Sequence, residues 1–346
     1  MMQKPPFENV DSLSELGEFG LIDRIAHLFG RKGDEGETGI GDDCAVLPLG
    51  GNRSLLITTD MLIEDRHFSR DWISPGDLGY KSLAVNLSDI SAMGGKPKHA
   101  FLSIGLPEDL SLEWIEKYFR ETHALASSHN VRLMGGDTTK SSGPLVINYT
   151  ILGEMKTENL LWRSSAKPGD QIAVLGDLGE SGTGLKLLLE KKPPFSSSEQ
   201  KLIDAHHRPQ LFIDEAQFLA ESGAVNAMID LSDGLQSDGG HIAKASEASL
   251  VVESEMITVT QSLQNICETY EWNPLELALA SGEDYGLLFT INSEKAEALK
   301  RSFKDAFGYG FSIIGEVKNG PGELKLLKNG DTLELGKTGF DHFKSG

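Results

Sequence analysis

The residues most suited to chemistry are Gly135, Gly136 and Asp137, which lie between two apolar runs at 131–134 and 145–152. The runs are short and apolar enough to form buried strands. Two glycines after a strand predict a tight turn at which the backbone can approach a bulky ligand, and Asp137 would hold a cation there. A polyphosphate with magnesium fits this description. Because glycines before an aspartate are also common in ordinary turns, the motif alone leaves a purely structural role open.

Further carboxylates lie mostly at strand ends or turns, beside glycine, serine or threonine: Asp42, Asp43, Asp60, Asp89, Asp230, Asp233 and Glu283. Two carboxylates about 4 Å apart repel by about 4 kcal/mol at an effective dielectric constant near 20. If several converge, the fold needs cations to neutralise them. Oxygen ligands without a cluster of Cys or His favour Mg²⁺ over Zn²⁺. The predicted chemistry is therefore phosphoryl transfer, in which the protein mainly positions groups and neutralises charge.

Structural roles stay open for several of these residues. Asp230 and Asp233 stand where a predicted strand passes into a predicted helix, and aspartates at such places often cap the helix. Asp89 shares one face of a predicted helix with small polar side chains, which suits either a site or a solvated surface. Arg163 can contact a phosphate with its forked guanidinium group or lie on the surface. His67 lies in a polar loop, where a histidine is often merely solvated.

The 346 residues are enough for two domains with a large core. Lys and Arg number 32 and Asp and Glu 52, so the formal net charge is −20. This balance disfavours nonspecific binding of nucleic acid or of anionic membranes. Only two cysteines occur, Cys44 and Cys267, which favours a reducing compartment. No apolar signal segment or run of transmembrane length is present, so we expect a soluble, cytoplasmic protein.

Alternating predicted strands and helices indicate an α/β class with two domains, 1–155 and 156–346, joined by the polar segment 156–170. Residues 176–186 resemble a phosphate-binding P-loop, but Leu185 stands where that motif has lysine, so we reject it. Apolar runs predict strands at 54–59, 99–106, 131–134, 145–152, 171–175, 224–229 and 287–291. Helical spacing predicts helices at 18–29, 77–93, 112–127 and 235–247.

Taken together, these segments resemble the thiamine-monophosphate kinase family over essentially the whole chain. The resemblance is carried by Gly39–Ala45, Thr58–Asp60, His67–Phe68, Ala84–Gly94, Gly135–Thr139, Arg163–Asp170, Asp230–Leu235, Ser281–Tyr285 and Asp341–Phe343. Each segment is short, but finding all of them in this order is highly specific. The wider superfamily includes aminoimidazole ribonucleotide synthetase and other enzymes with the same ATP and magnesium machinery.

The resemblance implies a two-domain α/β fold of the α+β type, as in the aminoimidazole ribonucleotide synthetase-like superfamily. The N-terminal domains of a homodimer would pair into a β-barrel, with ATP and several Mg²⁺ ions in the cleft between the domains. The implied reaction is ATP-dependent phosphorylation of thiamine monophosphate to thiamine diphosphate. The N-terminal domain would carry ATP and magnesium binding together with dimerisation.

The resemblance also assigns roles by position. Among the implied metal ligands, Asp60, Asp137 and Asp233 are expected to be the most critical. The implied metal ligands are Asp43, Thr58, Thr59, Asp60, Asp89, Asp137, Asp230 and Asp233. The implied nucleotide contacts are Gly136, Asp137, Arg163 and Ser232. The implied contacts to the thiamine phosphate are His67, Glu283 and Phe340, where relatives often have Trp or Tyr in place of the phenylalanine.

The acceptor is itself a phosphate, and its second pKa of about 6 leaves it mostly dianionic at neutral pH. We therefore expect no general base, and a direct in-line transfer without a phosphorylated enzyme. Two alternatives remain: another superfamily enzyme such as an ATP-dependent cyclo-ligase, and a non-catalytic acidic protein that binds divalent cations. His67, the turn at 281–284 and the tail at 341–343 favour the kinase over the cyclo-ligase.

Overall fold

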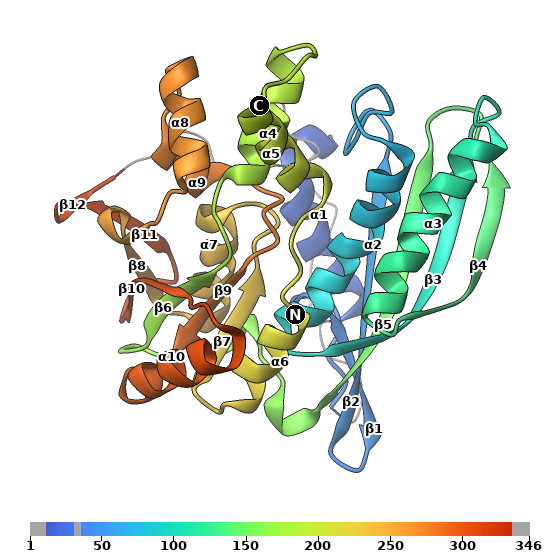
Figure 1. Cartoon of the computed structure of the whole chain (residues 1–346). Coiled ribbons are helices and arrows are strands. Elements are labelled where there is room, and N and C mark those ends of the chain that lie inside the picture. The colour runs from blue at the N-terminus through green and yellow to red at the C-terminus, as the bar shows by residue number, and fades with distance from the viewer. Residues whose placement is uncertain (1–11, 31–35, 334–346) are drawn as a thin grey trace.

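The computed structural model describes residues 12–30 and 36–333, and Phe340 and the tail at 341–343 lie outside these ranges. Two β-sheets, one from each half of the chain, lie on either side of the long helix α2 (Pro75–Ala92), as Figure 1 shows. The expected combination of α and β elements is confirmed. Within the described ranges, none of the helices has the length and apolar character needed to span a membrane.

The first sheet has five strands in the order β1-β2-β5-β3-β4. All neighbours run antiparallel except β3 and β4, which run parallel. Its strands are β1 (Ala45–Gly50), β2 (Arg53–Ile63), β3 (Lys96–Leu106), β4 (Arg132–Lys140) and β5 (Val146–Lys156). The helices α2 and α3 (Leu112–Ser128) cover one face (Figure 1). The sheet does not close on itself, because β1 and β4 are its two edges.

The second sheet has seven strands in the order β12-β11-β8-β10-β6-β9-β7, again mostly antiparallel. Its strands are β6 (Gln171–Leu175), β7 (Val225–Asp230), β8 (Ser249–Glu253), β9 (Leu287–Ile291), β10 (Ser312–Lys318), β11 (Leu324–Lys328) and β12 (Asp331–Thr332). The remaining helices are α1 (Leu13–Phe29), α4 (Glu180–Glu190), α5 (Ser197–His207), α6 (Ile213–Glu221), α7 (Leu235–Ser246), α8 (Gln261–Tyr270), α9 (Pro274–Ala280) and α10 (Ser293–Phe307).

Helix α2 is buried on nearly all sides because both halves of the chain pack against it. It contacts β2 and β5 of the first sheet, and β7, α5 and α6 of the second half. Its polar residues are therefore not a solvated stripe: Ser82 and Asn86 are each 1% exposed. The Ser82 hydroxyl lies 2.8 Å from the Tyr118 hydroxyl, and the Asn86 side-chain oxygen accepts from the Asp60 backbone N–H at 3.0 Å. Small polar residues on α2 thus fix the neighbouring strand β2 and helix α3.

The predicted glycine turn at 135–137 is wrong, because strand β4 continues through these residues to Lys140. A bulge separates the pairs Ala100–Leu133 and Phe101–Gly135. Gly136 has a φ of +148°, and a Cβ there would lie 1.7 Å from the Leu102 carbonyl oxygen on β3. Glycine is therefore required for the close approach of two paired strands rather than for a reversal of the chain.

We predict that Gly136→Ala lowers the free energy of unfolding by more than about 3 kcal/mol, because β3 and β4 must separate to admit the methyl group. Chemical denaturation followed by circular dichroism measures the loss. Gly135→Ala is the matched control, since its Cβ would make an ordinary 3.9 Å contact with Phe101 and cost at most about 1 kcal/mol. Equal losses in the two variants would contradict the steric argument.

Candidate functional site

Three carboxylates from distant parts of the chain meet beside the end of α2. Asp43 precedes β1, Asp89 lies in the last turn of α2, and Asp230 ends β7 in the second half. One oxygen atom from each carboxylate lies within 4.8 Å of the others. Such a group of oxygen donors from both halves of the molecule is suited to a hard divalent cation.

Strand β2 adds Thr58 and Asp60 to this group. The Thr58 hydroxyl donates to the Asp89 carboxylate, and the Asp60 side chain lies on the same face of the strand. Burial and, secondarily, the negative charge of Asp43 raise the pKa of Asp60 to about 6. Because Thr58 reaches Asp89 from this face of β2, the Asp60 side chain also points toward the side on which Asp43, Asp89 and Asp230 meet.

The cluster contains more negative charge than its surroundings neutralise. Burial and the charge of Asp43 raise the pKa of Asp230 to about 7, even though the Ser88 hydroxyl donates to Asp230 at 2.5 Å. Burial, followed by the neighbouring charges of Asp60 and Asp230, also raises the pKa of Asp89 well above its usual range. Asp89 and Asp230 must therefore gain either a proton or a nearby cation.

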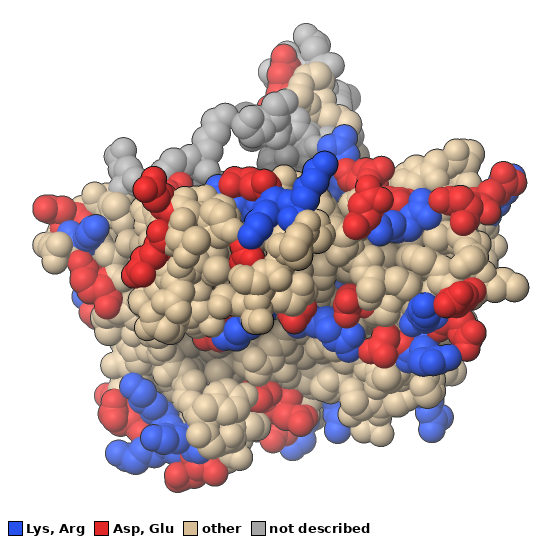
Figure 2. All heavy atoms as spheres, turned by 45° about the horizontal axis from the view of Figure 1, so that its top comes forward, with Lys and Arg blue, Asp and Glu red and all other residues tan. Residues whose placement is uncertain are grey.

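Arg163 supplies a positive charge at this site. Its Nη2 atom lies 2.5 Å from one Asp43 oxygen, its Nε atom 3.3 Å from the other, and its backbone N–H donates to Asp42 at 3.2 Å. Even so, burial and the charge of Asp43 raise the pKa of Asp42 to about 7. On the face drawn in Figure 2, acidic and basic side chains are interspersed and no continuous basic area is visible.

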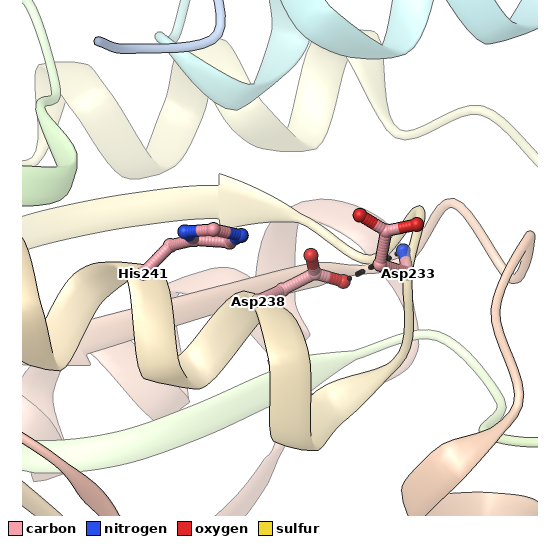
Figure 3. Close-up of side chains that lie close together, drawn as sticks. All are labelled: Asp233, Asp238 and His241. Atoms are coloured by element: carbon pink, nitrogen blue, oxygen red, sulfur yellow. Dashed lines mark hydrogen bonds between the residues drawn. The ribbon is translucent and has the colours of Figure 1, made fainter. Parts of the chain in front are cut away.

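A second group, which the sequence interpretation did not include in full, lies beside the first. Asp233, Asp238 and His241 each have a ligand atom within 4.8 Å of the others (Figure 3). Asp238 and His241 are three positions apart on α7, and Asp238 accepts from the Asp233 backbone N–H at 3.0 Å. Burial lowers the pKa of His241 to about 4, so its ring is neutral at neutral pH. The sequence signal that could have identified this group was the spacing of three positions between Asp238 and His241, which places them on one helix face soon after Asp233.

Two predicted metal ligands project from the opposite face of the first sheet. Thr59 alternates with Asp60 along β2, and its hydroxyl accepts from the Asn148 amide at 3.1 Å. Across the paired strands, Asp137 on β4 lies opposite Ser103 on β3, and Ser103 lies opposite Asn148 on β5. Asn148 in turn lies opposite Met61 on β2. Asp137 therefore lies on this second face and about 14 Å from β2, which is three strand spacings. Within one chain, the structure does not bring Thr59 or Asp137 to the cluster.

The turn that carries Glu283 is joined to the turn before α7. The Glu283 N–H donates to the Ser232 carbonyl at 2.7 Å, and the Tyr285 N–H to the Leu231 carbonyl at 2.9 Å. Glu283 and Tyr285 have positive φ angles of 62° and 51°, which are unfavourable for residues other than glycine. Strain of this kind is often found where a side chain must be held in one direction. The predicted substrate residue Glu283 thus lies beside the predicted nucleotide residue Ser232.

The remaining predicted residues are placed as follows. His67 lies in the loop after β2, where its Nδ1 atom accepts from the Ile63 N–H at 3.0 Å. This bond assigns the ring proton to Nε2. Gly136 lies on the edge strand β4, as described above. Phe340 lies outside the described residues.

Comparison with known proteins agrees with this geometry. Residues 41–155 match the family model of the AIR synthase related protein, N-terminal domain, and residues 167–326 match that of the C-terminal domain. The chain is 40% identical to a thiamine-monophosphate kinase of Aquifex aeolicus, over 96% of this chain and 99% of that protein. It is 38% identical to the thiamine-monophosphate kinase of Escherichia coli K12, over 94% and 98%. A solved structure described as AaThiL complexed with AMPPCP and TMP has a TM-score of 0.83, 35% identity and coverage of 97% and 100%.

The fold and both family models define an AIR synthase related protein with two domains. Within that class, the chain belongs to the thiamine-monophosphate kinase family, as its full-length similarity to members of that family shows. It is accordingly a phosphotransferase.

We predict that the melting temperature of the metal-free protein falls between about pH 5 and pH 8. The folded pKa values of Asp42, Asp60 and Asp230 lie at about 6 to 7, above the unfolded value of 3.8. A raised pKa contributes stability below the unfolded pKa, and this contribution is lost as pH rises through the folded pKa. Mg²⁺ should therefore raise the melting temperature more at pH 8 than at pH 5, as measured by scanning calorimetry with chelator or with Mg²⁺.

The variant Asp230→Asn serves as the control, because it removes one of the titrating groups and should flatten the dependence on pH. The same gain from Mg²⁺ at both pH values in the unaltered protein would contradict the electrostatic account.

Proposed function

We propose that this chain transfers the γ-phosphoryl group of ATP to thiamine monophosphate and so forms thiamine diphosphate. The observation that carries the proposal is the convergence of Asp43, Asp89 and Asp230 from both halves of the chain. Arg163 contacts the same group, and the chain belongs to the family of thiamine-monophosphate kinases. The site thus combines ligands for cations with a guanidinium group suited to phosphate.

The metal ligands in this proposal are Asp43, Thr58, Asp60, Asp89 and Asp230, with Asp233 at the neighbouring group. The donors fit magnesium because they are carboxylate and hydroxyl oxygens. The nearby Cys44 thiol is not a ligand in this arrangement, since it donates to the Asp89 carbonyl at 3.4 Å. When bound, Mg²⁺ supplies charge neutralisation and holds the phosphates in place. Several ions are expected, because one divalent ion does not balance this many carboxylates.

For the nucleotide, we assign Arg163, Ser232 and Gly136. Arg163 is held in place by Asp43, so its guanidinium group is oriented before a phosphate arrives. Ser232 lies at the turn between β7 and α7, next to Asp230 and Asp233. These residues bind and orient the polyphosphate, which is most of what phosphoryl transfer requires of a protein.

For the acceptor, we assign His67, Glu283 and Phe340. The acceptor phosphate is mostly dianionic at neutral pH, so it needs no general base. The role of these residues is to orient the thiamine phosphate in line with the bound nucleotide. The transfer is then direct, and no phosphorylated enzyme forms.

We also propose that two copies of the chain pair through the first sheet to form a β-barrel. Every residue of the edge strand β4 is exposed, and Leu133 and Met134 are 50% and 56% exposed. On the sheet face away from α2, Met61 and Phe101 are 50% and 40% exposed. A long exposed edge strand beside exposed apolar side chains is usually covered by a partner. In this dimer, Asp137 and Gly136 on β4 contribute to the metal and nucleotide site of the other protomer.

We further propose that the domains are residues 1–155 and 156–346 and that the protein acts in the cytoplasm. The boundary is supported by the end of β5 at Lys156 and by the separate family models for 41–155 and 167–326. The cytoplasmic location is supported by the two cysteines, which are both free thiols.

We predict that the purified protein forms thiamine diphosphate from thiamine monophosphate, ATP and Mg²⁺, and that a chelator abolishes the reaction. Asp60→Asn should lower kcat by at least about 100-fold, because it weakens cation binding at the transferring phosphate. Chromatographic measurement of thiamine diphosphate gives the rate. Asp305→Asn, at an exposed position of α10, is the matched control and should have no effect.

Two results would count against this account: no thiamine diphosphate above a control without enzyme would contradict the function, and radioactive phosphate retained on the protein during turnover would contradict the direct transfer. The second result would remove the direct transfer but keep the kinase.

We predict that Asp137→Asn folds normally, lowers turnover by orders of magnitude, and regains activity when combined in mixed dimers with Asp60→Asn. A heterodimer of these variants holds one intact site, so co-expression in equal amounts should restore about one quarter of the normal activity. Co-expression of Asp60→Asn with Asp43→Asn is the matched control, because both changes fall in the same cluster and no intact site can form. Recovery in neither mixture would exclude a contribution of Asp137 to the partner's site.

A further inference from the structure

Lys81 on α2 is a buried cation that the proposed reaction does not use. Its side chain is 1% exposed and points away from the first sheet toward the second half of the chain. Its ammonium group lies 3.2 Å from Nε2 of His206 on α5 and 3.3 Å from a carboxylate oxygen of Glu283. Burial of a lysine is costly unless its charge is paired and its hydrogens are bonded, so both contacts matter.

His206 extends this arrangement to the same carboxylate. Because Lys81 donates to Nε2, the ring proton lies on Nδ1, which is 3.1 Å from the Ser181 hydroxyl and 3.3 Å from the Glu283 carboxylate. Burial and the neighbouring charge of Lys81 lower the pKa of His206 well below its usual range, so the ring is neutral. Glu283 thus faces one cation and one neutral donor.

The backbone around Glu283 is held as firmly as its side chain. Gly282 lies against the Ser232 carbonyl, where a Cβ would come within 2.4 Å. On the other side, the Asp284 carboxylate accepts from the N–H groups of Gly179 and Ser181 at 2.7 and 3.1 Å. The Glu283 side chain is nevertheless 26% exposed, so it is fixed from behind and open toward solvent.

We propose that Lys81 is a positioning residue that, together with His206, holds the Glu283 carboxylate in the orientation that contacts the thiamine phosphate. The inference rests on the proposed function, in which Glu283 contacts the acceptor. Thiamine carries a cationic thiazolium ring and an amino group, and both are favourable partners for a fixed carboxylate. Without Lys81, the carboxylate loses its charged partner and is held less firmly, and binding of the acceptor must then order it at an entropic cost.

The competing explanation is that Lys81 only joins the two halves of the chain. The molecule offers a matched control for this explanation. Arg208, at the end of α5, pairs with Asp77 on α2 and Glu121 on α3 at 2.9 Å each, so it crosses the same boundary. Its side chain is 40% exposed, and its ion pairs are made with Asp77 and Glu121 rather than with Glu283.

The experiment is a double-mutant cycle on initial rates with Lys81→Met, Glu283→Gln and the double variant, beside Arg208→Met. Each single variant at the first two positions should raise the KM for thiamine monophosphate about tenfold, with the KM for ATP and kcat changed less than about twofold. The double variant should match Glu283→Gln alone, because Lys81 acts through that carboxylate. Arg208→Met should leave both KM values unchanged.

Additive effects in the double variant, or an equal rise in KM with Arg208→Met, would overturn the proposal while leaving the kinase itself intact. A normal KM in Glu283→Gln would also overturn it, together with the assigned role of Glu283. If the unaltered protein forms no thiamine diphosphate, the proposed function itself is refuted instead. If Lys81→Met does not fold, His206→Gln takes its place in the cycle, and the same non-additivity is expected.

Discussion

The constraint on which the rest of this structure depends is the crowding of like charges. Asp43, Asp60, Asp89 and Asp230 converge in a partly buried region where Arg163 supplies a positive charge. Such a group is unfavourable in isolation, since burial and mutual repulsion both oppose ionisation. The fold tolerates this group because well-packed helices and strands on both sides hold the carboxylates in place. Bound cations can also relieve the repulsion between them. The repulsion that lowers the stability of the metal-free protein is relieved when a cation binds, which raises the affinity for metal and for the nucleotide that the metal holds.

Helix α2 makes this arrangement possible. It packs on the first sheet with one face and on β7, α5 and α6 with another, so it is buried on nearly all sides. Asp89 at its end joins the acidic cluster, and Lys81, two turns earlier, reaches Glu283 in the second half. A single rigid helix therefore sets the distance between the cation site and the carboxylate that we assign to the acceptor. Small movements of one half of the chain relative to the other would therefore disturb both the carboxylate cluster at Asp89 and the contact between Lys81 and Glu283.

How much of the site could be predicted from sequence differed from residue to residue. Asp43, Asp89 and Asp230 were named as candidate ligands from their residue type and neighbours, and the structure does bring them together. The small polar residues near Asp89 were left open between a site and a solvated surface, and Ser82 and Asn86 prove to be buried supports of β2 and α3. The glycine turn at 135–137 was wrong, because glycine is equally required where two strands approach closely. Asp238, His241, Lys81 and His206 were not identified, since each is unremarkable within its own helix.

By itself, the sequence determined the class of fold, the acidic character of the site, the choice of hard oxygen ligands and the family. These properties follow from residue types and local periodicity, which can be read along one segment at a time. Only the tertiary structure decided which carboxylates share a centre and which do not. Asp60 and Thr59 are adjacent in the chain, yet the pleat of β2 sends them to opposite faces of the sheet. Asp137 lies on the same face as Thr59 because of the register of the paired strands. This register depends on pairing between distant segments and cannot be read from one segment alone.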